Sequence, residues 1–291
     1  MKKLLTICFI LIHTWSLASN NDQAPWYIVQ ISDPQLGFIE KNKSIEQETI
    51  LLKKAIQKIN SLQPEILVIT GDFVNSSHNI EHMKKFKELC HLISHEILLY
   101  KVPGNHDIGN SCNKENVDFY NAQYGEDHFS ILHKGVQLIG INSCLIKDDA
   151  PQQKHQLQWL HKELKQKCKI EQRIIFGHHP FFLSNISEKE SYSNMPIKIR
   201  TIYNALFLKY HVSHYFAGHL HNNATAENNG IKYITTSALG KQLGNARSGI
   251  RIIQIKNKKI SHLYVPIEDI PASQTAVSYT HLRAHETLRH L

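Results

Sequence analysis

Short apolar segments alternate with amphipathic helical segments along most of this chain, and this alternation limits the folds open to it. Strand-like runs rich in β-branched and aromatic residues occupy residues 26–32, 65–70, 97–102, 128–132, 136–142, 173–176 and 213–217. Helices are predicted between them over residues 44–62, with Ser44 as N-cap, and over 81–94, 114–124, 151–164 and 197–210. Three more strands, over residues 231–237, 250–255 and 259–265, follow without helices. This order predicts a layered α/β fold with one mixed sheet or two stacked sheets.

The two ends of the chain differ in character from residues 25–270, which no repeat or Pro/Gly/Ser-rich linker divides. Residues 1–18 combine a basic head, an apolar run and Ser16-Leu17-Ala18, which is typical of a signal peptide cleaved after Ala18. A buried first strand or a membrane anchor is the alternative, but the run is too short to cross a bilayer. We therefore expect an exported protein, periplasmic or secreted, without a stable membrane span after cleavage. Residues 277–291 are interpreted as a non-native or disordered tail, so their histidines are not counted as ligands.

The composition bounds the possible partners and the redox chemistry. Lys and Arg number 33 against 25 Asp and Glu, giving a formal charge of +8, with no block rich in Lys or Arg. This diffuse charge suits an anionic substrate and does not predict a nucleic-acid partner. Beyond the first 18 residues the cysteines are Cys90, Cys112, Cys144 and Cys168, none spaced as C-x-x-C. In an exported protein they could form up to two disulfides with the pairing open, although the apolar surroundings of Cys144 favour a buried thiol.

Five strand-like runs end directly in polar clusters. The clusters are Ser32-Asp33-Pro34-Gln35, Gly71-Asp72, Gly104-Asn105-His106-Asp107, Gly177-His178-His179-Pro180 and Gly218-His219-Leu220-His221. In open α/β sheets, sites form beyond the carboxyl ends of strands, and a glycine lets the chain turn sharply off the strand. Side chains far apart in the sequence are therefore expected to converge on one pocket.

The residue types in these clusters predict a metal site. Carboxylate, amide oxygen and imidazole suit hard-to-borderline divalent ions such as Mn, Fe, Zn or Mg rather than a thiolate-type site. Two ions are favoured over one, because the candidate ligands are numerous and Asp72 can bridge. Taken singly, Asp33 or Asp72 could be a helix N-cap, Asn105 a plain turn residue, and His178 or His219 a structural histidine. Only the joint pattern favours the metal site over these readings.

The order of the motifs, D-x-[H/Q], G-D, G-N-H-D, G-H-H and G-H-x-H, resembles that of the calcineurin-like metallophosphoesterases over residues 27–266. Asp33-Pro34-Gln35, the segment from Gly104 to Gly109, and Gln242-Leu243-Gly244 are similar to the calcineurin-like phosphoesterase domain-containing subgroup, described as protein Ser/Thr phosphatases. The resemblance implies an α/β/β/α metallo-dependent phosphatase fold, in which helices flank two stacked mixed sheets.

The resemblance also implies the roles of individual residues. One metal ion would be held by Asp33, Gln35, Asp72 and His221, and the other by Asp72, Asn105, His178 and His219. His106 would lie outside the metal shell, near the leaving oxygen, as electrophile or general acid. Asp107 would orient His106 through the second ring nitrogen.

Gln35 departs from the family pattern, in which many members carry His. A neutral amide oxygen is a weaker ligand than imidazole for late transition metals, so this position favours Mg or Mn. His179 is left between a pocket wall and a support for the ligands. Arg200, Arg247 and Lys241 are expected on solvated faces.

These observations predict a binuclear metal-dependent phosphoesterase that hydrolyses phosphate monoesters of small molecules or phosphoproteins. In that mechanism a metal-bridging hydroxide attacks phosphorus in line, the ions and Asn105 neutralise charge, and His106 assists the leaving oxygen. The alternatives are a phosphodiesterase acting on nucleotides or lipid head groups, and a non-catalytic module that binds phosphorylated ligands. The presence of both His106 and Asp107 argues against the second alternative.

Overall fold

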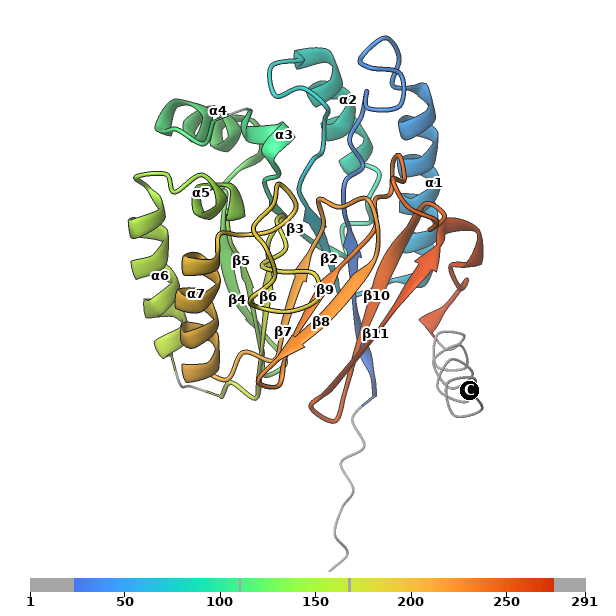
Figure 1. The fold of residues 1–291 in the computed structure, drawn as a ribbon. Helices are drawn as coiled ribbons and strands as arrows, with labels where there is room; N and C mark the ends of the chain where they lie inside the picture. Colours follow the sequence, from blue (N-terminus) through green and yellow to red (C-terminus); the bar gives the residue numbers. More distant parts are fainter. Residues whose placement is uncertain (1–23, 110, 167–168, 275–291) are drawn as a thin grey trace, which may run out of the picture.

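The computed structural model describes residues 24–109, 111–166 and 169–274 (Figure 1). The predictions for residues 1–18 and 277–291 lie outside these described residues, as does Cys168. Within the described ranges, no helix is both long and apolar enough to span a membrane.

Two mixed sheets form the middle of the molecule. The five-stranded sheet has the order β11-β10-β1-β2-β3, built from β1 (Trp26–Ile31), β2 (Ile66–Thr70), β3 (Leu98–Val102), β10 (Gly249–Lys256) and β11 (Lys259–Pro266). The six-stranded sheet has the order β4-β5-β6-β7-β9-β8, built from β4 (Phe129–His133), β5 (Val136–Gly140), β6 (Gln172–Phe176), β7 (His214–Ala217), β8 (Ala224–Asn228) and β9 (Ile231–Thr235). Strands β1, β2 and β3 are parallel to one another, and so are β5, β6, β7 and β9.

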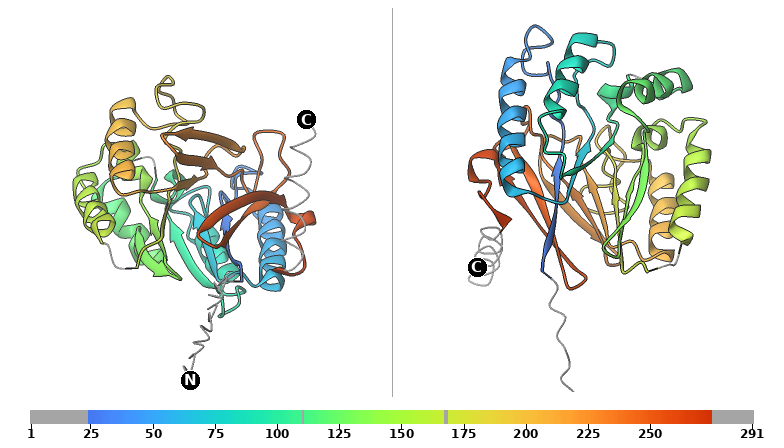
Figure 2. Two further views of the ribbon diagram at one scale, coloured as in Figure 1. Left: turned by 90° about the horizontal axis from the view of Figure 1, so that it is seen from below. Right: turned by 180° about the vertical axis from the view of Figure 1, so that it is seen from behind.

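Helices cover the outer face of each sheet (Figures 1 and 2). The helices beside the first sheet are α1 (Glu46–Leu62), α2 (Ile80–Cys90) and α4 (Lys114–Tyr124), and those beside the second are α6 (Gln153–Lys165) and α7 (Ile197–Lys209). Short helices α3 (Asn105–Ile108) and α5 (Ser143–Lys147) follow β3 and β5, and a 3-10 turn, η1 (Ile267–Asp269), follows β11.

Side chains of β2 show why both faces of the first sheet are buried. Leu67 and Ile69 pack into the cluster shared with the outer helices, whereas Ile66 and Val68 pack into the cluster between the two sheets. This is the two-residue alternation of a strand, applied to a segment that is apolar on both faces. The predicted α/β/β/α layering is therefore confirmed.

Several local predictions differ from the structure. Helix α1 begins at Glu46 with Ile45 in the N-cap position, although the Ser44 hydroxyl accepts a hydrogen bond from the Glu46 amide at 3.2 Å. Helix α2 ends at Cys90, and α6 begins at Gln153. The short helices α3 and α5 and the edge strand β8 were not predicted, because α3 and α5 span one turn or little more and β8 lacks an apolar run.

The structure bears on two expectations about single residues: the disulfides left possible for the cysteines, and the solvated face expected for Arg200. Cys90, Cys112 and Cys144 are free thiols, so no disulfide joins any two of the described cysteines, and Cys144 is buried as predicted. Arg200 is not on a solvated face. Its side chain is 0% exposed and its guanidinium donates to the backbone carbonyls of Met195, Ile186 and Glu188.

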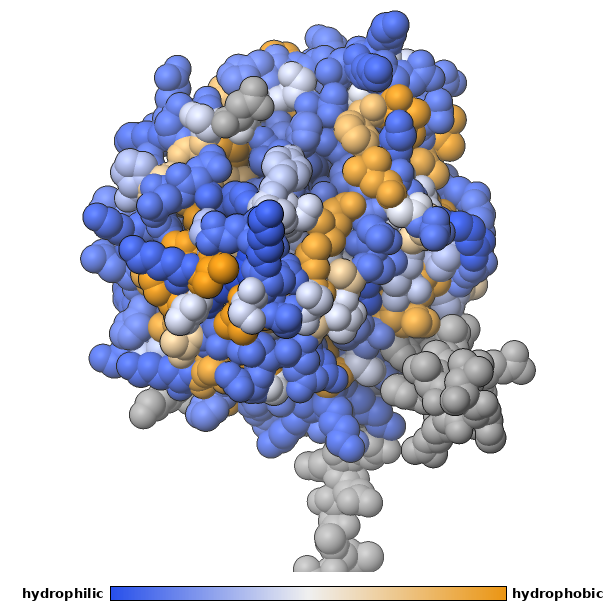
Figure 3. All heavy atoms as spheres, in the orientation of Figure 1, coloured by the Kyte–Doolittle hydropathy of each residue, from blue (hydrophilic) through white to orange (hydrophobic). Residues whose placement is uncertain are grey.

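Hydrophobic side chains form small separate patches among hydrophilic ones on the face drawn in Figure 3. This face therefore carries no single broad apolar area of the kind that marks an extensive protein or membrane contact.

Candidate metal centre

The predicted ligands are carried by loops at the carboxyl ends of strands from both sheets. Asp33 and Gln35 follow β1, Asp72 follows β2, and Asn105 begins α3 after β3. His178 follows β6, and His219 and His221 follow β7. The two sheets are joined at this end by Gln30, whose side-chain amide donates to the Ala217 carbonyl at 3.0 Å. The ends of parallel strands thereby face one another, and the loops meet.

Five of these residues have a left-handed backbone. The φ angles are 50° at Asp33, 38° at Gln35, 50° at Asp72, 72° at His219 and 51° at His221. Such conformations are uncommon for residues other than glycine and cost of order 1–3 kcal/mol each, and they gather at functional sites where the surrounding structure enforces them. The loops are therefore shaped to aim these side chains at one point.

His178 lies at the centre of the cluster. Its Nδ1 donates to the Thr70 carbonyl at 2.9 Å, which leaves the Nε2 lone pair free in the neutral ring. That Nε2 lies 3.1 Å from Asn105 Oδ1, 3.2 Å from His219 Nδ1 and 3.5 Å from Asp72 Oδ1. Several atoms that carry lone pairs thus face one another across a short distance, an arrangement that a cation stabilises.

Asp33 and His221 form a second close pair of possible ligand atoms beside His178. His221 Nδ1 donates to the Lys241 carbonyl, so its Nε2 faces Asp33 Oδ1 at 3.5 Å. Asp33 Oδ2 accepts from the His219 amide at 3.0 Å. Carbonyl partners on the far ring nitrogens of His178 and His221 fix the tautomers in the way usual for metal-ligating histidines.

Burial and charge act together on these groups. Burial would raise the pKa of Asp33, but His221 and His178 hold it well below its usual value. Burial and the neighbouring His178 lower the pKa of His219 to about 3. Asp33 is therefore an anion and His219 a neutral base at neutral pH, which are the protonation states that metal binding requires.

The donor set fits divalent metal ions. Ligand atoms of Asp33, Asp72 and His178 lie within 4.8 Å of one another, and so do those of His178, His179 and His219. Gln35 is 1% exposed and tied to Asp72 through a backbone hydrogen bond of 2.8 Å, yet its Oε1 has no partner. A buried acceptor without a donor is costly, and a bound cation would satisfy it.

His106 and Asp107 are placed differently from the prediction. His106 Nδ1 donates to the backbone carbonyl of Asn75 at 2.9 Å, and that carbonyl orients the ring. The Asp107 carboxylate accepts instead from the amides of Phe73 at 2.8 Å, Val74 at 3.3 Å and Gly104 at 2.9 Å. The expected orientation of His106 by Asp107 is therefore wrong: Asp107 joins the loops after β2 and β3.

Replacing Asp107 by Ala is expected to lower the free energy of unfolding by about 3 kcal/mol, because three amide donors lose a buried acceptor. Urea unfolding of the metal-free protein measures this loss. Asp118→Ala, at an exposed carboxylate paired with Lys114, is the control and should change little. If Asp107→Ala left the stability unchanged but reduced turnover, the result would support the original prediction that Asp107 orients His106.

Two residues complete the surroundings of the cluster. His179 is buried with its ring centroid 4.5 Å from that of His219, and it lines a pocket beside His106, which agrees with its expected place in a pocket wall. Tyr192 was not predicted. Its ring lies 4.8 Å from that of His219, and its hydroxyl accepts from Asn105 Nδ2 at 3.3 Å. No motif surrounds Tyr192, so the sequence offered no signal for it.

The cluster could hold divalent ions and lies where loops from two sheets meet, and comparisons with known proteins show which family has this fold. The sequence model described as Calcineurin-like phosphoesterase matches residues 27–223. The chain is 30% identical to the serine/threonine-protein phosphatase CPPED1 of Danio rerio over 84% of this chain and 86% of that protein.

Solved structures are similar in fold. A dimetal phosphatase from Danio rerio superposes with a TM-score of 0.60 at 12% identity, over 83% of this chain and 99% of that one. The purple acid phosphatase PPD1 from yellow lupin seeds (Lupinus luteus) superposes with a TM-score of 0.63 at 15% identity, over 86% of this chain and 53% of that one.

The chain belongs to the calcineurin-like phosphoesterase family. It is accordingly a hydrolase of phosphoric esters, and it carries a cluster of Asp and His side chains that could hold a divalent metal ion.

Proposed function

We propose that this protein hydrolyses phosphate monoesters with two divalent ions bound at the cluster. The observation that carries the proposal is the set of lone-pair atoms around His178 Nε2, at 3.1–3.5 Å, beside the pair formed by Asp33 and His221. Asp33, Gln35, Asp72 and His221 would hold one ion, and Asp72, Asn105, His178 and His219 the other. When bound, such ions supply Lewis acidity to the phosphoryl oxygens and activate water.

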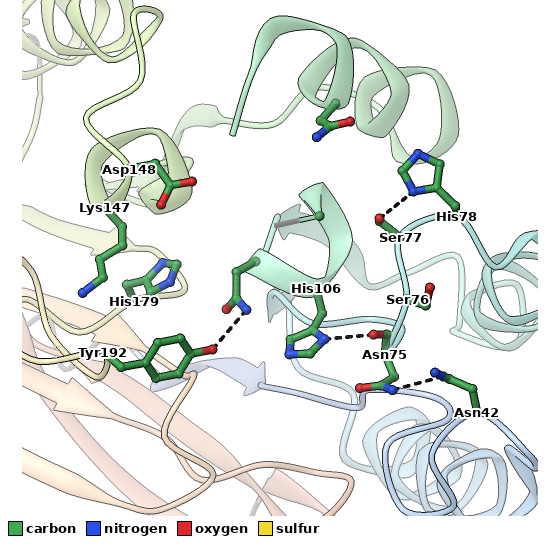
Figure 4. A pocket seen from close by; sticks show the side chains of 13 residues that line it. Asn42, Asn75, Ser76, Ser77, His78, His106, Lys147, Asp148, His179 and Tyr192 are labelled. Carbon is green, nitrogen blue, oxygen red and sulfur yellow. Dashed lines mark hydrogen bonds between the residues drawn. The ribbon is translucent and has the colours of Figure 1, made fainter. Parts of the chain in front are cut away.

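His106 supplies the proton for the leaving oxygen in this proposal. Its Nδ1 is occupied by the Asn75 carbonyl, and its ring lines the adjacent pocket (Figure 4). Because Nδ1 is held by that carbonyl, Nε2 is the ring nitrogen that would pass a proton to the departing alkoxide. Asn105 lies between the cluster and the pocket. Its Oδ1 faces His178, and its Nδ2 donates to the Tyr192 hydroxyl.

His106→Ala is expected to lower turnover by about 10²–10⁴-fold, the usual contribution of a positioned acid. Bound metal should be unchanged, because His106 is not one of the proposed ligands. Hydrolysis of p-nitrophenyl phosphate and metal analysis of the same samples measure the two quantities. His95→Ala, at a side chain 91% exposed, is the control. A large loss of metal in His106→Ala would show that His106 is a ligand instead.

The monoester assignment is supported by the Ser/Thr-phosphatase relative, which this chain matches over most of both lengths. The test compares p-nitrophenyl phosphate with bis-p-nitrophenyl phosphate under Mn supplementation. A higher kcat/KM for the diester would support the phosphodiesterase alternative. No turnover of either ester by metal-loaded protein would support the non-catalytic, ligand-binding alternative.

The neutral amide of Gln35 favours Mg or Mn at its ion site. Metal analysis of gently purified protein, followed by reconstitution with single metals, tests this assignment. Activity restored by Zn or Fe but by neither Mg nor Mn would contradict it.

Export to the periplasm or the medium is supported by the signal-peptide pattern of residues 1–18. Cell fractionation with intact-mass measurement tests it, and we expect a mature chain that starts after Ala18. A full-length protein retained in the cytoplasm would contradict export.

A further inference from the structure

A polar cavity of about 710 Å³ opens beside His106, the residue proposed to supply the proton for the leaving oxygen. Figure 4 shows His106 between two walls, one with Asn75 and Ser77 and the other with Tyr192 and His179. The volume is within the usual range for a small-molecule site, about 300–1,000 Å³. The cavity is therefore large enough for the alcohol part of a phosphate ester.

The two lining residues of this cavity with a fixed charge have opposite signs, and each is hydrogen-bonded to backbone groups. Among its described lining residues they are Lys147 and Asp148. The Lys147 ammonium donates to the carbonyls of Ser191 and Asn194, while Asp148 accepts from the Cys112 amide at 3.0 Å. One lysine and one aspartate of opposite sign give these two lining residues no net formal charge with which to select a second phosphate or an acidic peptide. The cavity thus suits a neutral ligand.

Uncharged hydrogen-bonding groups line the rest of the cavity. Side chains of Asn42, Asn75, Ser76 and Asn116 contribute amides and a hydroxyl. Asn116 donates from Nδ2 to the Ser111 carbonyl at 2.8 Å, and no protein donor within the described residues reaches its Oδ1. The Ser76 hydroxyl likewise makes no bond to another described side chain or backbone group. Such atoms can bond several hydroxyls of one ligand.

Tyr192 adds an exposed aromatic surface over the metal cluster. Tyr192 is 69% exposed, and the centroid of its ring lies 4.8 Å from that of His219. Two side chains hold the loop that carries Tyr192. Arg200 donates to the carbonyls of Ile186 and Glu188, and Lys147 donates to the carbonyl of Ser191, the residue before Tyr192. A rigid loop that displays an aromatic ring at a site entrance positions that ring for contact with substrate.

We infer that this cavity binds the leaving alcohol of the substrate and that this alcohol is a neutral, hydroxyl-rich small molecule, as in a monosaccharide or polyol monophosphate. Tyr192 is the contact residue for its less polar face. This inference rests on the proposed monoesterase function and narrows its substrate class. A phosphoprotein is the competing class, and this recess offers its extended chain no net formal charge from Lys147 and Asp148.

The test measures kcat and KM for glucose 6-phosphate, p-nitrophenyl phosphate and a phosphoserine peptide with Mn-loaded enzyme. We expect kcat/KM for glucose 6-phosphate to exceed that for the peptide at least about tenfold. Tyr192→Ala should raise KM for glucose 6-phosphate about tenfold, and Asn116→Ala about fivefold, the losses expected for a ring contact and a hydrogen bond. Tyr210→Ala, at the opposite end of α7, is the matched control.

Inorganic phosphate separates a contact to the alcohol from damage to the phosphoryl site, because it lacks an alcohol. Its inhibition constant should rise much less than the KM for glucose 6-phosphate in Tyr192→Ala, and Tyr192→Phe, which keeps the ring and loses only the hydroxyl that accepts from Asn105, should raise that KM less than Tyr192→Ala does. A phosphate inhibition constant that rises in parallel with KM overturns the inference, and so does a preference for the peptide. Failure to release phosphate from any ester, p-nitrophenyl phosphate included, overturns the proposed function itself.

Discussion

Asp72→Asn is expected to reduce phosphomonoester turnover by about 10³-fold, which corresponds to about 4 kcal/mol of transition-state stabilisation. Asp72 contributes negative charge to a cluster in which its Oδ1 lies 3.5 Å from His178 Nε2. In the proposal, Asp72 is the ligand that both ions would share. Asn has nearly the same shape but no charge, so it weakens both sites while preserving the hydrogen bond that Oδ1 accepts from the His106 amide at 2.9 Å.

The measurement combines Mn-supplemented hydrolysis of p-nitrophenyl phosphate, metal analysis and thermal unfolding with and without Mn. Mn should raise the midpoint of the parent protein and not that of the variant, because a ligand stabilises only the state that binds it. Without metal the variant should be at least as stable, since it no longer places a second buried carboxylate near Asp33. Asp118→Asn is the matched control on the surface. Equal activity in parent and Asp72→Asn would contradict the two-metal proposal.

Much of the site could be predicted because it depends on a simple geometric rule. Apolar runs such as Ile66–Thr70 identify buried strands, and parallel strands end at one edge, so the polar residues that follow them meet. The convergence of Asp33 with His178 and His221 required only this rule. The two-sheet layering was left open by the pattern of elements and followed from the family resemblance.

Other features depend on tertiary contacts that leave no periodic signal. The family resemblance implied that Asp107 orients His106, but the turn of α3 points the Asp107 carboxylate at the amides of Phe73 and Gly104. Arg200 was expected on a solvated face because arginine side chains are mostly exposed. In the structure its hydrogen bonds to loop carbonyls offset part of the cost of burying the guanidinium. Tyr192 is positioned by that same loop, which has neither strand nor helix periodicity.

The loops after β2 and β3 touch backbone to backbone, and this contact makes Gly104 indispensable. Gly104 has φ −101° and ψ 175°, values that any residue can adopt. A Cβ at this position would lie 2.1 Å from Asp72 Oδ1 and 2.4 Å from the Asp72 amide nitrogen. The obstruction is therefore steric, and part of it is backbone that cannot rotate away.

Gly104→Ala is expected to lower the free energy of unfolding by about 3 kcal/mol and to abolish metal binding, because overpacking pushes the Asp72 loop from its place. Gly125→Ala is the control that introduces backbone strain without a steric clash, so it separates the two causes of destabilisation. Gly125 has φ +90° with no atom within 4 Å of a new Cβ, so its substitution should cost about 1 kcal/mol and leave metal and turnover intact. Urea unfolding and metal analysis of both variants decide the question. If Gly104→Ala bound metal as fully as Gly125→Ala, the close contact between the two loops would not be what holds Asp72 in the site.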